Sequence, residues 1–185
     1  YQCDWSSDVC SSDLPVAISL DTYKAKVMQA AIEVGVDCIN DIWAFRQPHA
    51  MEVVAKHSCG VMLMHMQKDP KTMQFDPHYE DVVSEVNGFL VERCVALEDE
   101  GVARERLAID PGFGFGKTVQ HNMLMLADFR TFCQHGLPVV AGISRKSSLG
   151  AITGRDVDHR VTASVAAALM TIERGARIVR VHDVG

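Results

Sequence analysis

Short apolar runs alternate with longer amphipathic runs along most of this chain, and this alternation constrains the fold more than any other feature of the sequence. Runs of this kind predict parallel strands joined by crossover helices, and therefore an α/β fold. The predicted strands are residues 16–20, 38–39, 61–64, 107–109, 139–142 and 178–181. The predicted helices are residues 24–34, 49–56, 80–100, 121–133 and 160–174.

Composition and charge exclude several classes of protein. With 185 residues, 48% of them hydrophobic, the chain is long enough for one substantial core and one domain. The formal net charge is -6 and the basic residues are scattered, so the sequence predicts no nucleic-acid partner. No apolar run approaches the roughly 20 residues that span a bilayer, and no basic start with an apolar run indicates a secretory leader. We therefore expect a cytoplasmic protein with no membrane partner.

The beginning of the chain differs from the rest. Residues 1–14 are rich in serine and aspartate and show neither the two-residue period of a strand nor the 3.6-residue period of a helix. Residues 3–14 closely resemble the translation of a common sequencing-library adapter, which predicts a non-native tail; a genuine disordered tail is the alternative. We place the folded domain at residues 15–185.

A glycine-rich loop follows the fourth predicted strand. Asp110 ends an apolar run, and Phe113 and Phe115 alternate with glycines as far as Lys117. A Walker-type phosphate loop would need glycine where Pro111 stands, and a dinucleotide fingerprint would need its last glycine where Lys117 stands. The loop therefore matches neither phosphate motif. An ordinary glycine-rich connection is the alternative to a ligand-binding loop.

Acceptor side chains follow three of the predicted strands. Asp21, Asn40 and Asp110 come after the first, second and fourth strands, and the carboxyl ends of parallel strands form the ligand site of such folds. Their carboxylate and amide groups suit the edge of a flat nitrogen heterocycle. Each taken singly is as well explained by a helix cap or a turn. His65, after the third strand, is predicted to be a structural histidine rather than a ligand.

Cationic side chains follow the last two predicted strands. Lys146, Arg180 and His182 offer a point charge, a planar fork and an extra donor, which suit a phosphate or pyrophosphate. A solvated loop would also explain Lys146. Arg180 is harder to explain in that way, because it lies in an apolar run where an unpaired charge would cost several kcal/mol. Arg180 is therefore expected to have an anionic partner.

The glycine loop at residues 110–117, the triplet at 144–146 and residues 180–183 match the dihydropteroate synthase family in order and spacing. Residues 19–22, 39–42 and 63–67 fit the same family, so the resemblance covers residues 15–185. It implies a (β/α)8 barrel that belongs to folate biosynthesis. Members of the family condense dihydropterin pyrophosphate with p-aminobenzoate and release pyrophosphate.

The resemblance also implies a role for individual residues. The pterin ring would be held by Asp21, Asn40, Met64, Asp110, Phe115 and Lys146. The pyrophosphate would be bound by Lys146, Arg180 and His182, and the p-aminobenzoate would lie near Ser144. The catalytic group would be Asp110, Lys146, Arg180 and His182. The reaction implied is a substitution in which pyrophosphate departs before the amine attacks.

Six strands fall short of an eight-stranded barrel. Against the family pattern, the first two βα units and the final helix would be absent, which predicts a partial barrel with two open edges. Mg²⁺ is implied by the family only, because its ligand would lie in the absent first loop. The family also suggests a homodimer. We expect this polypeptide alone to be unstable or inactive.

Two other functions compete with this prediction. Another pterin-binding barrel, such as a methyltetrahydrofolate methyltransferase, would share Asp21, Asn40 and Asp110 but would not use Lys146 and Arg180 as a pyrophosphate site. A pterin-binding fragment without catalytic activity is the second alternative. Pterin binding without product formation would favour it.

Overall fold

The computed structural model describes residues 16–70 and 72–184, so residues 1–14 lie outside the described part of the chain. Its strands are β1 (Ser19–Asp21), β2 (Cys38–Asp41), β3 (Gly60–Met64), β4 (Leu107–Asp110), β5 (Val140–Ala141) and β6 (Ile178–Val179). Its α-helices are α1 (Ala25–Glu33), α2 (Ala50–Ala55), α3 (Val82–Asp99), α4 (Val119–Ala127), α5 (Ser147–Thr153) and α6 (Val161–Glu173). Three 3₁₀ helices are η1 (Arg104–Arg106), η2 (Phe129–His135) and η3 (Val157–His159).

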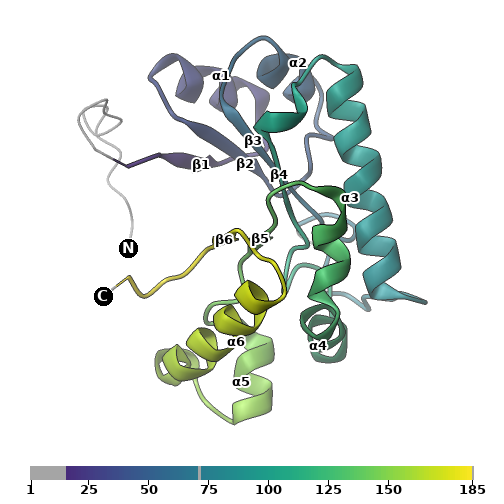
Figure 1. Ribbon diagram of the computed structural model, residues 1–185, viewed down its shortest axis with the longest axis vertical. Helices are drawn as coiled ribbons and strands as arrows, with labels where there is room; N and C mark the ends of the chain where they lie inside the picture. The colour runs from purple at the N-terminus through teal and green to yellow at the C-terminus, as the bar shows by residue number, and fades with distance from the viewer. Residues whose placement is uncertain (1–15, 71, 185) are drawn as a thin grey trace.

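The strands are parallel and follow one another across the sheet in chain order. β1 to β4 form one four-stranded sheet, and β5 and β6 form a second pair. The two groups meet where Ile109 of β4 bridges Val139 and its amide donates to the carbonyl of Pro138 at 3.0 Å. In Figure 1 the strands form one curved layer that is flanked by the helices. Within residues 16–70 and 72–184, no strand pairing joins β6 back to β1. The barrel is therefore open between these two strands.

The side of the sheet that faces the helices forms the main core. Ile39, Val61, Leu63 and Ile109 alternate along their strands with residues on the other face, and each is at most 1% exposed. Full burial of a side chain of this size stabilises the fold by about 1.5–3 kcal/mol. We call this helix-covered side the outer face and the opposite, concave side the inner face.

All six predicted strands and all five predicted helices are found in the predicted order, but their bounds differ and a sixth α-helix was not predicted. The helix predicted over residues 121–133 ends at Ala127, and η2 follows it. Phe129 and Phe132 are both fully buried, and a spacing of three residues puts them on one face of a 3₁₀ helix. The core contact of these two rings therefore favours the tighter winding.

Two further differences concern β5, β6 and α5. The predicted strands at 139–142 and 178–181 shorten to two residues each, so Arg180 follows β6 rather than lying inside it. The short helix α5 was not predicted, because its glycine and serines give little helical signal in the sequence. Packing supplies the missing stabilisation, since Ser148, Leu149 and Gly150 are buried.

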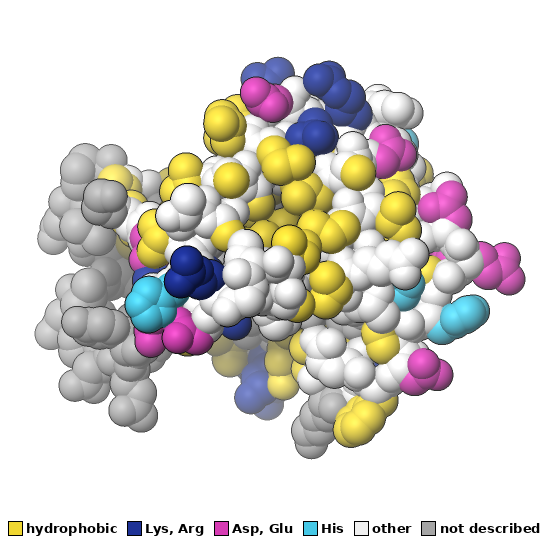
Figure 2. All heavy atoms as spheres, turned by 90° about the horizontal axis from the view of Figure 1, so that it is seen from below, with side chains coloured by type: hydrophobic (Ala, Val, Ile, Leu, Met, Phe, Trp, Pro, Cys, Tyr) yellow, Lys and Arg dark blue, Asp and Glu magenta, His cyan; other side chains and the backbone are white. Residues whose placement is uncertain are grey.

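The helices that come last in the chain have an apolar outer surface. Along α6, Val161, Val165, Leu169 and Ile172 recur at helical spacing and are each 40–62% exposed. Figure 2 shows hydrophobic side chains gathered on the face seen from below, where α5 and α6 lie. Among the described residues no helix is both long enough and apolar enough to cross a membrane.

Candidate ligand site at the carboxyl ends of the strands

Strand register places the predicted site residues on the inner face. Asp21 pairs with Asn40 across β1 and β2, and Met64 pairs with Asp110 across β3 and β4. All four lie at or next to the carboxyl ends of their strands. Below them, towards the amino ends, the inner face is filled by a small apolar cluster of Met62, Ala108 and Val140 against Cys38. The polar groups therefore form a layer above an apolar floor.

Asp21 and Asn40 form the first polar pair of this layer. The Nδ2 amide of Asn40 donates to Oδ1 of Asp21 at 2.6 Å. Asn40 is 1% exposed, and its Oδ1 is buried without a hydrogen-bond partner in the described chain. An unpaired buried acceptor costs about 1–3 kcal/mol, and a ligand N–H would satisfy it.

Asp110 lies at the centre of the inner face and has no exposed surface. Its Oδ1 accepts from the amide of Gly112 at 2.7 Å, and its Oδ2 accepts from an Nη of Arg180 at 2.7 Å. Asp110 is thus the anionic partner that Arg180 was expected to need. Gly142 makes room for the guanidinium, because a Cβ there would lie 2.6 Å from Nη2 of Arg180.

The two phenylalanines of the glycine loop point in different directions. Phe113 is 1% exposed and stacks on Phe129 in the outer core, with ring centroids 6.1 Å apart. Phe115 instead meets Lys146, whose Nζ lies 4.2 Å from the ring centroid. Burial lowers the pKa of Lys146, while the charge of Asp110 acts in the opposite direction. Phe115 therefore combines a flat apolar face with an adjacent cation.

Side-chain hydrogen bonds connect the chain segments that follow β5 and β6. The Ser144 hydroxyl lies 3.0 Å from Nδ1 of His182 and accepts from the backbone amide of His182 at 3.2 Å. Arg145 has a φ of 54°, which is unusual for a residue with a side chain. Its Nε and Nη2 both donate to the carboxylate of Asp183. These contacts fix Ser144 and His182 beside each other.

Two polar residues near the site serve the fold instead. Asp41 is buried and accepts from the amides of Trp43 and Phe45 at 2.7 and 2.8 Å, so it closes a turn after β2; burial raises its pKa to about 6. His65 is 6% exposed and packs edge-on against Phe89 of α3. The structural role predicted for His65 therefore agrees with its contacts.

Sequence reasoning missed the role of Lys117. It is 5% exposed, and its Nζ contacts His65 and two carbonyl groups of the glycine loop. Burial lowers its pKa, while Asp110 acts in the opposite direction. The signal in the sequence was a lysine directly after alternating glycines, which matches neither phosphate motif and does not by itself indicate a structural role.

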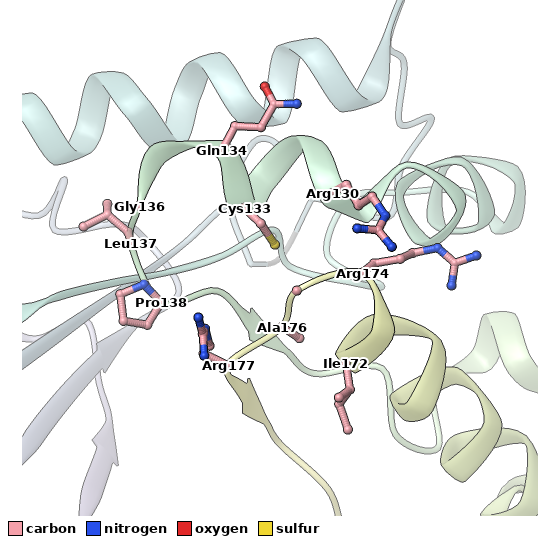
Figure 3. A pocket seen from close by; sticks show the side chains of 11 residues that line it. Arg130, Cys133, Gln134, Gly136, Leu137, Pro138, Ile172, Arg174, Ala176 and Arg177 are labelled. Carbon is pink, nitrogen blue, oxygen red and sulfur yellow. The ribbon is translucent and has the colours of Figure 1, made fainter.

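A separate cavity of about 660 Å³ lies at the other end of the strands, next to Pro138 and Arg177. Figure 3 shows Arg130, Arg174 and Cys133 around it. The arginines have a structural explanation: Arg130 donates to the carbonyl of Glu173 at 3.1 Å, and Arg174 donates to that of Ala127 at 3.3 Å. These carbonyls end α6 and α4, where cations are stabilising.

Residues 16–70 and 72–184 supply no cluster of metal-ligating side chains. They contain no group of three or more His, Cys, Asp or Glu side chains that could hold a metal ion. The Mg²⁺ that the family implies therefore has no ligand cluster among these side chains.

Comparison with known proteins identifies close relatives. The family model described as "Pterin binding enzyme" matches residues 8–182. Dihydropteroate synthase of Haemophilus influenzae is 49% identical over 167 residues, which cover 90% of this chain and 61% of that relative. The chain thus spans less than two thirds of that relative's length.

Solved structures give the same result. The crystal structure of dihydropteroate synthase from Stenotrophomonas maltophilia with active site-bound imidazole matches with a TM-score of 0.89 and 56% identity, covering 91% of this chain and 64% of that chain. Dihydropteroate synthase from Xanthomonas albilineans in complex with 7,8-dihydropteroate matches with a TM-score of 0.86 and 49% identity, covering 91% and 62%. The predicted partial barrel is confirmed by these matches.

Proposed function

This chain belongs to the pterin binding enzyme family, and on that premise we propose that it carries the pterin and pyrophosphate sites of a dihydropteroate synthase. The reaction joins dihydropterin pyrophosphate to p-aminobenzoate and gives dihydropteroate and pyrophosphate. The related enzyme from Xanthomonas albilineans, which binds 7,8-dihydropteroate, supports this choice of product. The observation that carries the proposal is that buried acceptors and cations meet on one inner face, with Asp110 bonded to Arg180 at 2.7 Å.

In this proposal the acceptors bind the pterin ring. The buried Oδ1 of Asn40, which has no partner among the described residues, accepts a ring N–H, and Asp110 accepts from the ring at the centre of the site. Phe115, next to Lys146, and Met64, paired with Asp110, supply apolar contacts beside the polar groups. Asp21 holds the Asn40 amide through the 2.6 Å bond, which leaves the Asn40 oxygen directed to the ligand.

The cations bind the pyrophosphate. A guanidinium has five N–H donors, and Asp110 and the Met62 sulfur, at 3.9 Å, take two of the positions on Arg180. The remaining donors, with Lys146 and His182, are available to phosphate oxygens. Ser144, 3.0 Å from the His182 ring, is the group that would meet the p-aminobenzoate.

The chemistry proposed is a stepwise substitution. The bond between the pterin methylene carbon and the pyrophosphate oxygen breaks, and its electron pair leaves with pyrophosphate, whose charge the cations stabilise. The carboxylate of Asp110 stabilises the cationic pterin methylene that is left. The amine nitrogen of p-aminobenzoate then forms the new C–N bond and loses a proton to solvent.

The test is a pair of measurements on the purified chain. Pterin binding is measured by fluorescence titration, and condensation is measured with dihydropterin pyrophosphate and p-aminobenzoate. We expect pterin binding, and we expect weak or no turnover by this polypeptide alone. Robust turnover would contradict that second expectation, and no pterin binding would contradict the proposed site. Pterin binding with no turnover in any longer form would favour the non-catalytic alternative.

The anion site has its own test. Lys146→Ala and Arg180→Ala should each weaken pyrophosphate binding about tenfold to a hundredfold, the loss of one charged hydrogen bond. Arg104→Ala is the matched control, because Arg104 pairs with Glu98 in an exposed position. Affinities that stay near wild type in both site variants would refute the assignment. A methyltransferase would also be expected to show affinities that neither substitution changes.

We further propose that the chain associates as a homodimer through the apolar face of α6. The support is the exposed stripe that includes Val161, Val165 and Leu169. Light scattering should give twice the monomer mass for the wild type and the monomer mass for Val165→Glu. A wild-type monomer at every concentration would contradict the proposal. The cytoplasmic location stays a prediction.

A further inference from the structure

The side chain of Lys117 makes three hydrogen bonds inside the protein. Its Nζ lies 2.9 Å from Nδ1 of His65, 2.9 Å from the carbonyl oxygen of Gly112 and 3.0 Å from that of Phe115. An ammonium group has three donors, so these three acceptors use all of them. Lys117, which is 5% exposed, therefore has no donor left for a ligand.

The three acceptors join parts of the molecule that are distant in sequence. Gly112 and Phe115 lie at the two ends of the tight part of the glycine loop, and His65 comes directly after β3. His65 is itself fixed, because its ring packs edge-on against Phe89 of α3 at 5.0 Å. Lys117 thus connects the loop after β4 to the end of β3 and, through it, to the outer core.

The centre of the loop also has other contacts, because the amide of Gly114 donates to Oδ1 of Asn122 at 2.7 Å. Gly112, Gly114 and Gly116 all have φ between 62 and 79°, and a Cβ at Gly112 would overlap the carbonyl oxygen of His65. Side chains from the neighbouring loop contact it from outside: Gln74 donates to the carbonyl of Gly114 at 2.7 Å, and Tyr79 to that of Gly116 at 2.8 Å.

We propose that Lys117 is a positioning residue that holds the glycine loop, so that Asp110 and Phe115 keep the geometry that a flat ligand needs. The link to Asp110 is direct: Gly112, whose carbonyl accepts from Lys117, also donates its amide to Asp110 at 2.7 Å. Phe115, whose carbonyl also accepts from Lys117, carries the ring that Lys146 covers. The inference rests on the proposed pterin site for the identity of the ligand.

The test uses Lys117→Met, which keeps most of the side-chain volume and removes every donor. Amide hydrogen exchange of Gly112 to Gly116 is measured without ligand, and pterin affinity is measured by fluorescence. We expect exchange in this loop to be at least tenfold faster and the affinity to be at least tenfold weaker. Lys56→Met is the matched control, because Lys56 is exposed at the end of α2, and it should change neither quantity.

A second variant keeps the proposal testable if Lys117→Met fails to fold. His65→Phe preserves the aromatic packing and removes one acceptor, and we expect a smaller change of the same sign in both quantities. In the double variant the two effects should be less than additive, because both act on one group of bonds.

Several outcomes would overturn the inference. Loop exchange equal to wild type in both variants would show that Lys117 does not hold the loop. Faster exchange with unchanged pterin affinity would show that its role is confined to folding. If the wild type itself binds no pterin, the proposed function fails for this chain, while the exchange measurement still decides whether Lys117 holds the loop.

Discussion

The outer and inner faces of the same sheet use their buried residues differently. On the outer face Leu63 and Ile109 pack among many other apolar side chains. On the inner face their neighbours Met64 and Asp110 lie at the level where buried polar groups pair with one another, above a cluster of only a few apolar residues. Adjacent residues of one strand therefore belong separately to the core and to the proposed site, and substitutions can test how far stability and ligand binding are independent.

The largest effect is expected at Asp110, on the inner face. Asp110→Ala removes the acceptor for both Gly112 and Arg180 and, in the proposed site, the charged acceptor for the pterin ring. We expect pterin affinity to fall about a thousandfold, or about 4 kcal/mol. Fluorescence titration measures the affinity, and Asp99→Ala, an exposed position on α3, is the control. An affinity within threefold of wild type would place the pterin elsewhere.

On the outer face, Leu63→Ala should lower stability rather than pterin affinity. We expect the free energy of unfolding to fall by about 3 kcal/mol, because a fully buried leucine leaves a cavity in a packed core. Urea denaturation measures the change, and the pterin affinity of the folded fraction should be unaltered. Met62→Ala on the inner face should cost about half as much stability. Equal losses of unfolding free energy in Leu63→Ala and Met62→Ala would contradict the view that the outer face contributes more to stability than the inner face.

His65 connects the two faces and should make stability depend on pH. Its pKa is lowered to about 2 by burial and then by the charges of Lys117 and Arg46, so the folded state keeps the ring neutral. The stabilisation is complete above the unfolded pKa near 6.5 and is lost as the pH falls towards 2. Between pH 7 and pH 5, the wild type should lose about 2 kcal/mol more stability than His65→Gln.

The measurement is urea denaturation of both proteins at each pH. Asp41, whose pKa is raised to about 6, contributes a slope of opposite sign, but that slope is shared by wild type and variant and cancels in their difference. Parallel stability curves for the two proteins would show that His65 titrates normally.

The smallest effect on stability is expected at Thr118, the N-cap of α4. The Thr118 hydroxyl accepts from the amide of His121, whose ring lies 3.2 Å from the Thr118 amide, and this pair begins α4. Thr118→Ala should lower the free energy of unfolding by about 1 kcal/mol. Pterin affinity should be unchanged in the same sample, and a parallel loss of affinity would link α4 to the site.

Much of this molecule follows from the order of residues along the chain. The alternation of apolar runs predicts parallel strands and helices in the observed order, and the polar residues after each strand predict the end at which they meet. Side chains alternate across a strand, so Asn40 with Met62, and Met64 with Asp110, share the inner face once register is set. The short helix α5 and the division after Ala127 were missed, because buried contacts rather than local propensity stabilise them.

The sequence by itself determined the period of each element and the chemical type of the side chains at the carboxyl ends of the strands. Only the tertiary structure decided which of those side chains are partners. Arg180 finds its anion in Asp110, 70 positions earlier, and Lys117 finds His65, 52 positions earlier. Periodicity is a property of neighbouring residues, whereas a hydrogen bond depends on strand order, register and the space that a residue such as Gly142 leaves open. Those quantities are set when the strands assemble.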